Sequence, residues 1–136
     1  MKKLRTMREI KFRGKSIHTQ KWEYGNLRIF GERAYISSID SHAQSEVLFS
    51  TVGQFTGLTD CNGKEIFEGD ILVYGGQCKH VVEFKHGMFG YTLADGLFVG
   101  YGGNSNFSFN PLDKSKEHEV IGNIHDNPEL LKGGDK

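Results

Sequence analysis

Apolar and polar residues alternate with a period of two along most of this chain, a pattern typical of short, half-buried β-strands. In the first third the alternation runs through residues 10–13, 22–30 and 34–37, and turn-like segments separate them. Residues 38–46 are polar without a period, so we expect a surface loop there. Extended structure resumes over residues 47–52. The pattern predicts a meander of short strands.

Sharp turns and short apolar strands follow from residue 53 onward. Asp60-Cys61-Asn62-Gly63 and Glu68-Gly69-Asp70 are turn sequences, and we expect Gly69 to have a backbone angle that disfavours a side chain. The apolar run Ile71–Tyr74 predicts a buried strand. Further strands are expected at residues 80–84, 88–92, 97–99 and 119–124.

Helical signals are confined to the end of the chain. Asn127 can cap a helix, Pro128 suits the first helical position, and Glu129 favours the helix dipole in the first turn. Gly133-Gly134 would end this helix after about one turn. No longer helical period occurs, so we expect a mainly β protein with one short C-terminal helix.

The strand pattern divides the chain into two expected units. Residues 1–52 form an N-terminal β meander with a basic lead-in, and residues 53–136 form a C-terminal β unit. The residues expected to be largely buried are Phe12, Trp22, Ile66, Phe67, Ile71, Val73, Val82, Phe84, Phe89, Val120, Ile121 and Ile124.

Composition supports this class and excludes others. The chain of 136 residues has 18 glycines and only 2 prolines, which suits many tight turns between strands. Its longest apolar run, Ile71–Tyr74, is too short to cross a membrane, and no apolar stretch follows the basic start as in a secretory signal. Two cysteines do not make a disulfide framework. We expect a cytoplasmic protein with free thiols and no membrane partner.

Charge is distributed unevenly although the net charge is zero. Residues 1–33 hold ten Lys or Arg against three Glu, whereas residues 34–136 hold seven Lys against fourteen Asp or Glu. A basic end of this kind can bind nucleic acid, dock on the acidic body of another subunit, or simply be a solvated start that protects an edge strand. The candidate nucleic-acid or partner surface comprises Lys2, Lys3, Arg5, Arg8, Lys11, Arg13, Lys15 and Lys21.

Catalytic and metal-binding motifs are missing from the sequence. There is no nucleophile elbow and no phosphate-binding loop. Four donors, Cys61, Cys78, His80 and His86, lack the paired spacing of a zinc site and are not expected to share one ion. The acidic residues Glu65, Glu68 and Asp70 lack the spacing of a calcium loop and suit turns better. We therefore expect no enzyme, no metal and no cofactor.

Three blocks of sequence resemble the YopX-type proteins of phages and prophages. They are residues 8–27, with Trp22-x-Tyr24-Gly25; residues 51–71; and residues 119–131. The similarity runs from about residue 7 to residue 131. It implies a mobile-element origin and a mostly β protein that assembles into oligomers, and it implies no catalytic residues. Cys61 stands where the family more often has a polar residue, which argues against a functional thiol.

The turn Glu68-Gly69-Asp70 leading into a strand, followed by Val81-Val82-Glu83-Phe84, resembles small SH3-like barrels. We therefore expect residues 53–136 to be an SH3-like β-barrel. Fold alone does not give function. The leading interpretation is a non-enzymatic accessory protein of a mobile element that acts through a protein-interaction or self-assembly surface. The alternative is a nucleic-acid-binding module that uses the basic N-terminal third.

Overall fold

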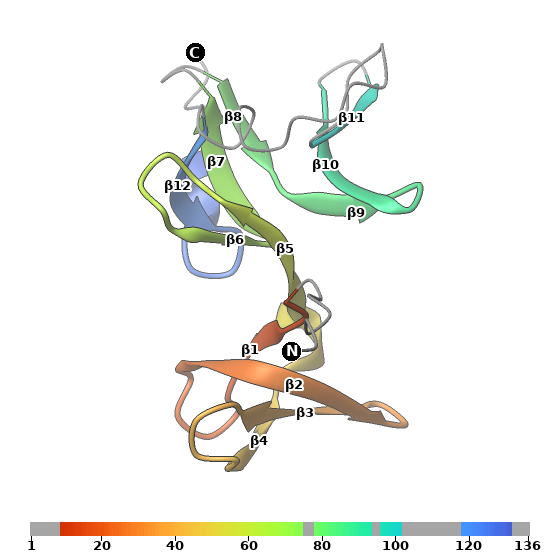
Figure 1. The fold of residues 1–136 in the computed structure, drawn as a ribbon, viewed down its shortest axis with the longest axis vertical. Helices are drawn as coiled ribbons and strands as arrows, with labels where there is room; N and C mark the ends of the chain where they lie inside the picture. Colours follow the sequence, from red (N-terminus) through yellow and green to blue (C-terminus); the bar gives the residue numbers. More distant parts are fainter. Residues whose placement is uncertain (1–8, 75–77, 94–95, 102–117, 132–136) are drawn as a thin grey trace, which may run out of the picture. The chain divides into compact units, whose positions relative to one another are not determined.

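The computed structural model describes residues 9–74, 78–93, 96–101 and 118–131, and it contains antiparallel strands and two short 3₁₀ turns (Figure 1). The chain divides into two compact units, residues 1–57 and residues 58–136. The expected mainly β class is confirmed. In the described residues, no helix is long and apolar enough to cross a membrane.

The first unit is built on the first five strands of a six-stranded, curled antiparallel sheet in the order β4-β3-β2-β1-β5-β6, of which β6 (Glu65–Phe67) belongs to the second unit. Its elements are β1 (Phe12–Lys15), β2 (Trp22–Phe30), β3 (Arg33–Ser38), β4 (Gln44–Val47), the 3₁₀ turn η1 (Phe49–Thr51) and β5 (Gly53–Thr59), which crosses the boundary of the unit. A bridge between Ser16 and Val47 joins the end of β1 to the end of β4. Curling lets one face of the sheet enclose a core.

The core of this unit consists of the buried side chains Ala34, Ile36 and Val47, and Phe12, Leu27 and Val52 pack against them. Gly14 lies on the same face of β1 as Phe12, because side chains alternate along a strand. A Cβ on Gly14 would lie only 2.8 Å from Val47 Cγ2. The absence of a side chain at this position therefore allows β1 and β4 to approach closely.

The second unit contains two three-stranded sheets, in the orders β12-β7-β8 and β11-β10-β9. Its elements are β6 (Glu65–Phe67), β7 (Asp70–Tyr74), β8 (Cys78–Val81), β9 (Glu83–Lys85), β10 (Met88–Thr92), β11 (Phe98–Gly100), β12 (His118–Asn123) and the 3₁₀ turn η2 (Pro128–Leu131). The buried core residues are Ile66, Leu72 and Val82, with Leu58, Tyr101 and Val120 packed around them.

A closed barrel is not found in the described residues of the second unit, so the expected SH3-like barrel is only partly matched. The ladder breaks at Val82, between β8 and β9, where the backbone N–H and C=O bond instead to the turn at Gly69 and Asp70. The strands on either side of this break belong to different sheets. The second unit therefore contains two small sheets and not one continuous barrel sheet.

The turn before β7 confirms the expectation for Gly69. Its backbone φ of 91° is a value that residues other than glycine rarely adopt. Its N–H donates to the Val82 carbonyl and its carbonyl accepts from the Ile124 N–H. The buried Asp70 carboxylate closes the turn by accepting the Phe67 N–H at 2.7 Å. The signature Glu-Gly-Asp is thus a junction that joins three segments of the unit.

The burial expected from the sequence is confirmed at Ile66, Phe67, Ile71 and Val82. Phe84 is the exception: its side chain is 50% exposed near the β9–β10 hairpin turn, where it packs on the ring of its cross-strand partner Phe89. The remaining expected core residues are half-buried: Phe12, Trp22, Val73, Phe89, Val120, Ile121 and Ile124.

The expected C-terminal helix is a single 3₁₀ turn in the described residues, Pro128–Leu131. The reason lies in the preceding segment. Asn123 holds a tight turn there, since its side-chain carbonyl accepts the N–H groups of His125 and Asp126. The Leu130 N–H then reaches back only three residues, to the Asn127 carbonyl.

Candidate functional site

The predicted basic surface lies partly outside the described residues, which begin at residue 9. Lys2, Lys3, Arg5 and Arg8 fall in that part of the chain. Lys11 precedes β1, while Arg13 and Lys15 belong to it, and the exposed Lys21 immediately precedes β2. The structure thus brings three of the predicted cations onto one strand and its lead-in.

These three cations share the face of the sheet that is turned away from the core, which we call the outer face. Side chains alternate along a strand, so Lys11, Arg13 and Lys15 point opposite to Phe12. The register pairs Lys15 with Trp22 and Arg13 with Tyr24, and directly opposed residues share a face. Two aromatic rings therefore stand among the cations.

Trp22 was expected in the core, and its place on the outer face is a correction. Its ring centre lies 4.5 Å from the Arg13 guanidinium carbon and 5.6 Å from Lys15 Nζ. Both spacings suit cation–π attraction. The indole is half-buried because it packs against cations rather than against the apolar cluster on the other face.

The outer face continues across β2 and β3. Arg28 lies over the Phe30 ring at 4.9 Å, and Phe30 meets Tyr35 edge-to-face with ring centres 6.4 Å apart. Arg33 pairs with Glu46 at 3.8 Å. A hydrogen bond to Tyr35 and the Glu46 charge raise the pKa of Arg33, so it stays cationic. Aromatic and cationic side chains therefore alternate over neighbouring strands.

Accessibility differs along the outer face. Toward β5, Arg13 and Phe55 are buried, and Lys11 lies 5.2 Å from the Phe55 ring centre and 3.2 Å from Glu9. Toward β3, the exposed aromatic residues are Tyr24, at 44%, and Phe30, at 60%. The accessible part of the outer face is therefore formed by Lys15, Trp22, Tyr24, Arg28, Phe30, Arg33 and Tyr35.

A second group of polar rings lies inside the second unit, and sequence reasoning did not find it. We call it the ring cluster: Tyr74, His80, Tyr91, Tyr101 and His118. His80 stacks on Tyr91 with ring centres 3.8 Å apart and meets His118 edge-on at 5.0 Å. Tyr101 lies 6.1 Å from His80 and 5.6 Å from His118. The rings come from β7, β8, β10 and β12 and from the residue that follows β11.

Burial shifts the titration of this cluster. It lowers the pKa of His80 to about 4, with a smaller contribution from His118, and it raises the pKa of Tyr101. His80 is 8% exposed and His118 is 2% exposed. Within the described residues, the buried atoms His80 Nε2 and Tyr101 Oη have no hydrogen-bond partner. Such atoms cost free energy unless something satisfies them.

The cysteines and acidic residues considered in the sequence analysis do not form a binding site in the described residues. Cys61 and Cys78 are exposed free thiols. In the part of the chain that the structure describes, no three His, Cys, Asp or Glu side chains gather as a metal-binding group. Asp60 accepts the N–H groups of Asn62, Lys64 and Val120, so it fastens its turn to β12.

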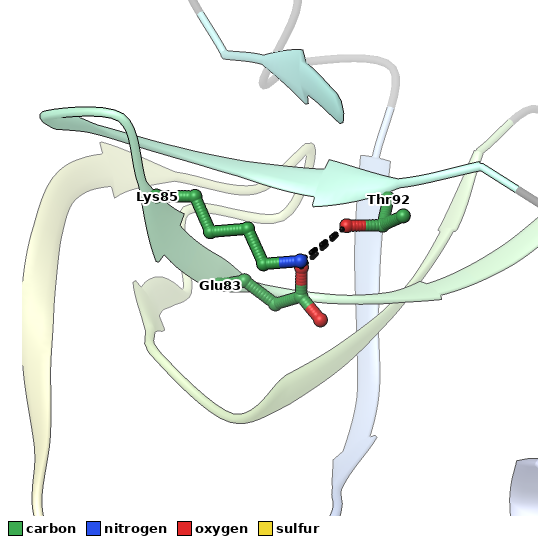
Figure 2. A network of polar contacts seen from close by, with 3 residues as sticks. All are labelled: Glu83, Lys85 and Thr92. Carbon is green, nitrogen blue, oxygen red and sulfur yellow. Dashed lines mark hydrogen bonds and ion pairs between the residues drawn. The ribbon is translucent and has the colours of Figure 1, made fainter. Parts of the chain in front are cut away.

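A polar network also ties the β9–β10 hairpin (Figure 2). Lys85 Nζ donates to Thr92 Oγ1 at 3.1 Å, Thr92 Oγ1 donates to Glu83 Oε1 at 2.7 Å, and Lys85 lies 3.5 Å from Glu83. These groups are at the surface, where ion pairs contribute little stability. The network fits a support for strand pairing better than a binding site.

Comparison with known proteins finds one matching family model and a similar solved structure. The family model described as YopX protein matches residues 11–132. The fold is similar to the crystal structure of protein EF1440 from Enterococcus faecalis, with 27% sequence identity and a TM-score of 0.54. That similarity covers 91% of this chain and 99% of the other. No curated protein matches the chain.

Proposed function

The chain belongs to the YopX protein family, and from this premise we propose that it is a non-enzymatic accessory protein of a phage, prophage or related mobile element that binds single-stranded nucleic acid. The binding surface is the accessible part of the outer face. The observation that carries the proposal is the alternation of exposed aromatic rings with cations on β1, β2 and β3.

Single-stranded nucleic acid needs both of these groups. Its bases stack on aromatic side chains, and its phosphates attract Lys and Arg. Tyr24 and Phe30 offer exposed ring surface, and Lys15, Arg28 and Arg33 stand within the same sheet face. An overall charge of zero does not oppose this, because the acidic residues are concentrated after residue 33.

Self-assembly through charge complementarity is the second candidate. Its support is the excess of cations in residues 1–33 and of carboxylates in residues 34–136. Complementary charge steers association and sets register. It would produce homo-oligomers, whereas the exposed aromatic residues would have no specific role. The stacking surface is the reason for preferring nucleic acid.

For the second unit we propose an SH3-like arrangement that stays open. Support comes from the strand orders β12-β7-β8 and β11-β10-β9, with only Val82 between β8 and β9. A single bent strand shared by two small sheets has this connectivity. For location we propose the cytoplasm of the bacterial host, where two exposed free cysteines would remain reduced.

The test is fluorescence anisotropy with a labelled single-stranded oligonucleotide, using wild type, Phe30→Ala and Phe84→Ala. Each stacked base is worth about 1–3 kcal/mol, so Phe30→Ala should weaken binding roughly fivefold or more. Phe84→Ala removes a ring of comparable exposure in the other unit, 50% against 60% for Phe30, and should bind as wild type does. If Lys15, Arg28 and Arg33 each contact one phosphate, the slope of log affinity against log salt should be about −2.

Two results would refute nucleic-acid binding. One is no binding by wild type at low salt. The other is equal weakening by Phe30→Ala and Phe84→Ala. A mass that rises with protein concentration and falls with salt in analytical ultracentrifugation, together with absent oligonucleotide binding, would favour self-assembly instead.

A further inference from the structure

The ring cluster contains buried polar atoms for which the described residues provide no hydrogen bond. They are His80 Nε2 and Tyr101 Oη. His80 is more than nine-tenths buried, so bulk water does not satisfy its ring. A buried group of this kind calls for an ordered water or an ion. The surrounding geometry allows the two to be distinguished.

Ring spacing matches what one tetrahedral ion would impose. With a zinc–nitrogen bond of about 2.0 Å, two imidazoles at a tetrahedral angle have ring centres about 5.2 Å apart, and a phenolate ring centre lies about 6 Å from each. The measured values are 5.0 Å between His80 and His118, and 6.1 Å and 5.6 Å from these rings to Tyr101. Aromatic packing alone gives spacings anywhere between about 4.5 and 7 Å.

Charge around the cluster favours a cation. Burial is the largest of the causes that raise the pKa of Tyr101, and the charges of Tyr91, Asp70 and Glu83 add to it, so two carboxylates lie near enough to act on the phenol. Asp70 is itself buried. A neutral imidazole has a lone pair on one ring nitrogen, and this lone pair can coordinate a metal ion. Nearby carboxylate charge attracts a divalent ion more strongly than it attracts a neutral water, which interacts only through its dipole and its hydrogen bonds.

We propose that His80, His118 and Tyr101 hold one divalent transition-metal ion of the zinc type, through a ring nitrogen of each histidine and the phenol oxygen. Imidazole nitrogen and oxygen donors suit such ions. On binding, the Tyr101 O–H bond breaks, the proton goes to solvent and the oxygen bonds to the metal. The site lies wholly within the second unit and is independent of the proposed nucleic-acid surface.

This donor set differs from the one weighed in the sequence. Only His80 is shared, and the exposed Cys61 and Cys78 take no part. Tyr91 stacks on His80 but is not a ligand, because its ring centre at 3.8 Å is too close for two rings bound to one ion. Tyr91→Phe is therefore a matched control for Tyr101→Phe: each removes one phenol oxygen from the same cluster.

The test is calorimetric titration of Zn²⁺ into chelator-treated full-length protein. It is done in a Cys61→Ser/Cys78→Ser background, so that surface thiols cannot bind the ion. Two buffers with different heats of ionisation report proton release, and Co²⁺ absorption reports tetrahedral geometry. We expect one ion per chain with release of about one proton at neutral pH, since the phenol ordinarily ionises near pH 10.

Three variants then separate ligands from neighbours. Tyr101→Phe should weaken binding by roughly tenfold or more and abolish proton release, and His80→Phe should abolish binding. Tyr91→Phe should match the background protein in both respects. Circular dichroism of each variant shows that it folds. Absence of saturable binding in the background protein, or unchanged proton release in Tyr101→Phe, would overturn the proposal.

Discussion

Acidification should destabilise the second unit through His80, and the size of the effect follows from its burial. The side chain is 8% exposed and stacks on Tyr91, so the protonated imidazole would lose hydration. Burial, with a smaller contribution from His118, lowers the pKa of His80 to about 4 from its usual 6.5. In the unfolded chain the same group takes up a proton near pH 6.5.

The sign and magnitude come from proton linkage. Above pH 6.5 His80 is neutral in both states and contributes no pH dependence. As the pH falls from 6.5 to 4, the unfolded state binds a proton that the folded state does not, so the free energy of unfolding falls. A difference of about 2.5 pKa units corresponds to about 3 kcal/mol at pH 4.

Urea unfolding at several pH values between 7.5 and 4 would measure this effect, with a chelator present so that no metal contributes. His80→Phe keeps a ring against Tyr91 but cannot titrate. Acidic side chains change stability in both proteins alike, so the difference between wild type and variant isolates His80. Wild type should lose about 3 kcal/mol more than the variant on acidification to pH 4. Parallel pH profiles would refute the reasoning.

Three stability predictions concern the second unit and can be checked by thermal or urea unfolding. Ile71→Ala removes a fully buried side chain and should cost about 2–5 kcal/mol, whereas Ile29→Ala, at a 48% exposed position, should cost far less; similar losses would contradict the assignment of the core. Gly69→Ala places a residue with a side chain at a backbone φ of 91° and should lower the free energy of unfolding by about 1–3 kcal/mol. An unchanged melting temperature would contradict the argument from backbone strain. Asp60→Ala leaves three backbone N–H groups without their acceptor and should cost at least about 1–3 kcal/mol; a neutral effect would mean that solvent replaces those bonds.

The proposed binding surface shows which of its residues local sequence can suggest. Lys11, Lys15 and Lys21 were identified from charge density alone, and Arg13 came with them although its side chain is buried. The part of the outer face that contains Arg28 and Phe30 was missed. Its signal was present in the alternation of Arg28 and Phe30, which lie two residues apart and therefore share a face of a strand.

Phe12 and Trp22 show why the core was only partly predictable. Both lie in strands with the same period-two pattern, so the sequence identifies their faces but not which face is enclosed. Curling of the first sheet, held by the Ser16–Val47 bridge, puts Phe12 inside and leaves Trp22 with the cations. That bridge joins residues far apart along the chain, and no local propensity encodes it.

The amino-acid sequence alone determined the strand-rich class, the turns and the conformation of Gly69. The period-two pattern and the turn preference of glycine both depend on only a few neighbouring residues. Tertiary structure alone decided the ring cluster. β7 pairs with β8 on one side and with β12 on the other, and this brings His80 and His118 together. Pairing of distant strands depends on the register and burial of the whole unit, so the ring cluster cannot be predicted from the local sequence around each of its residues.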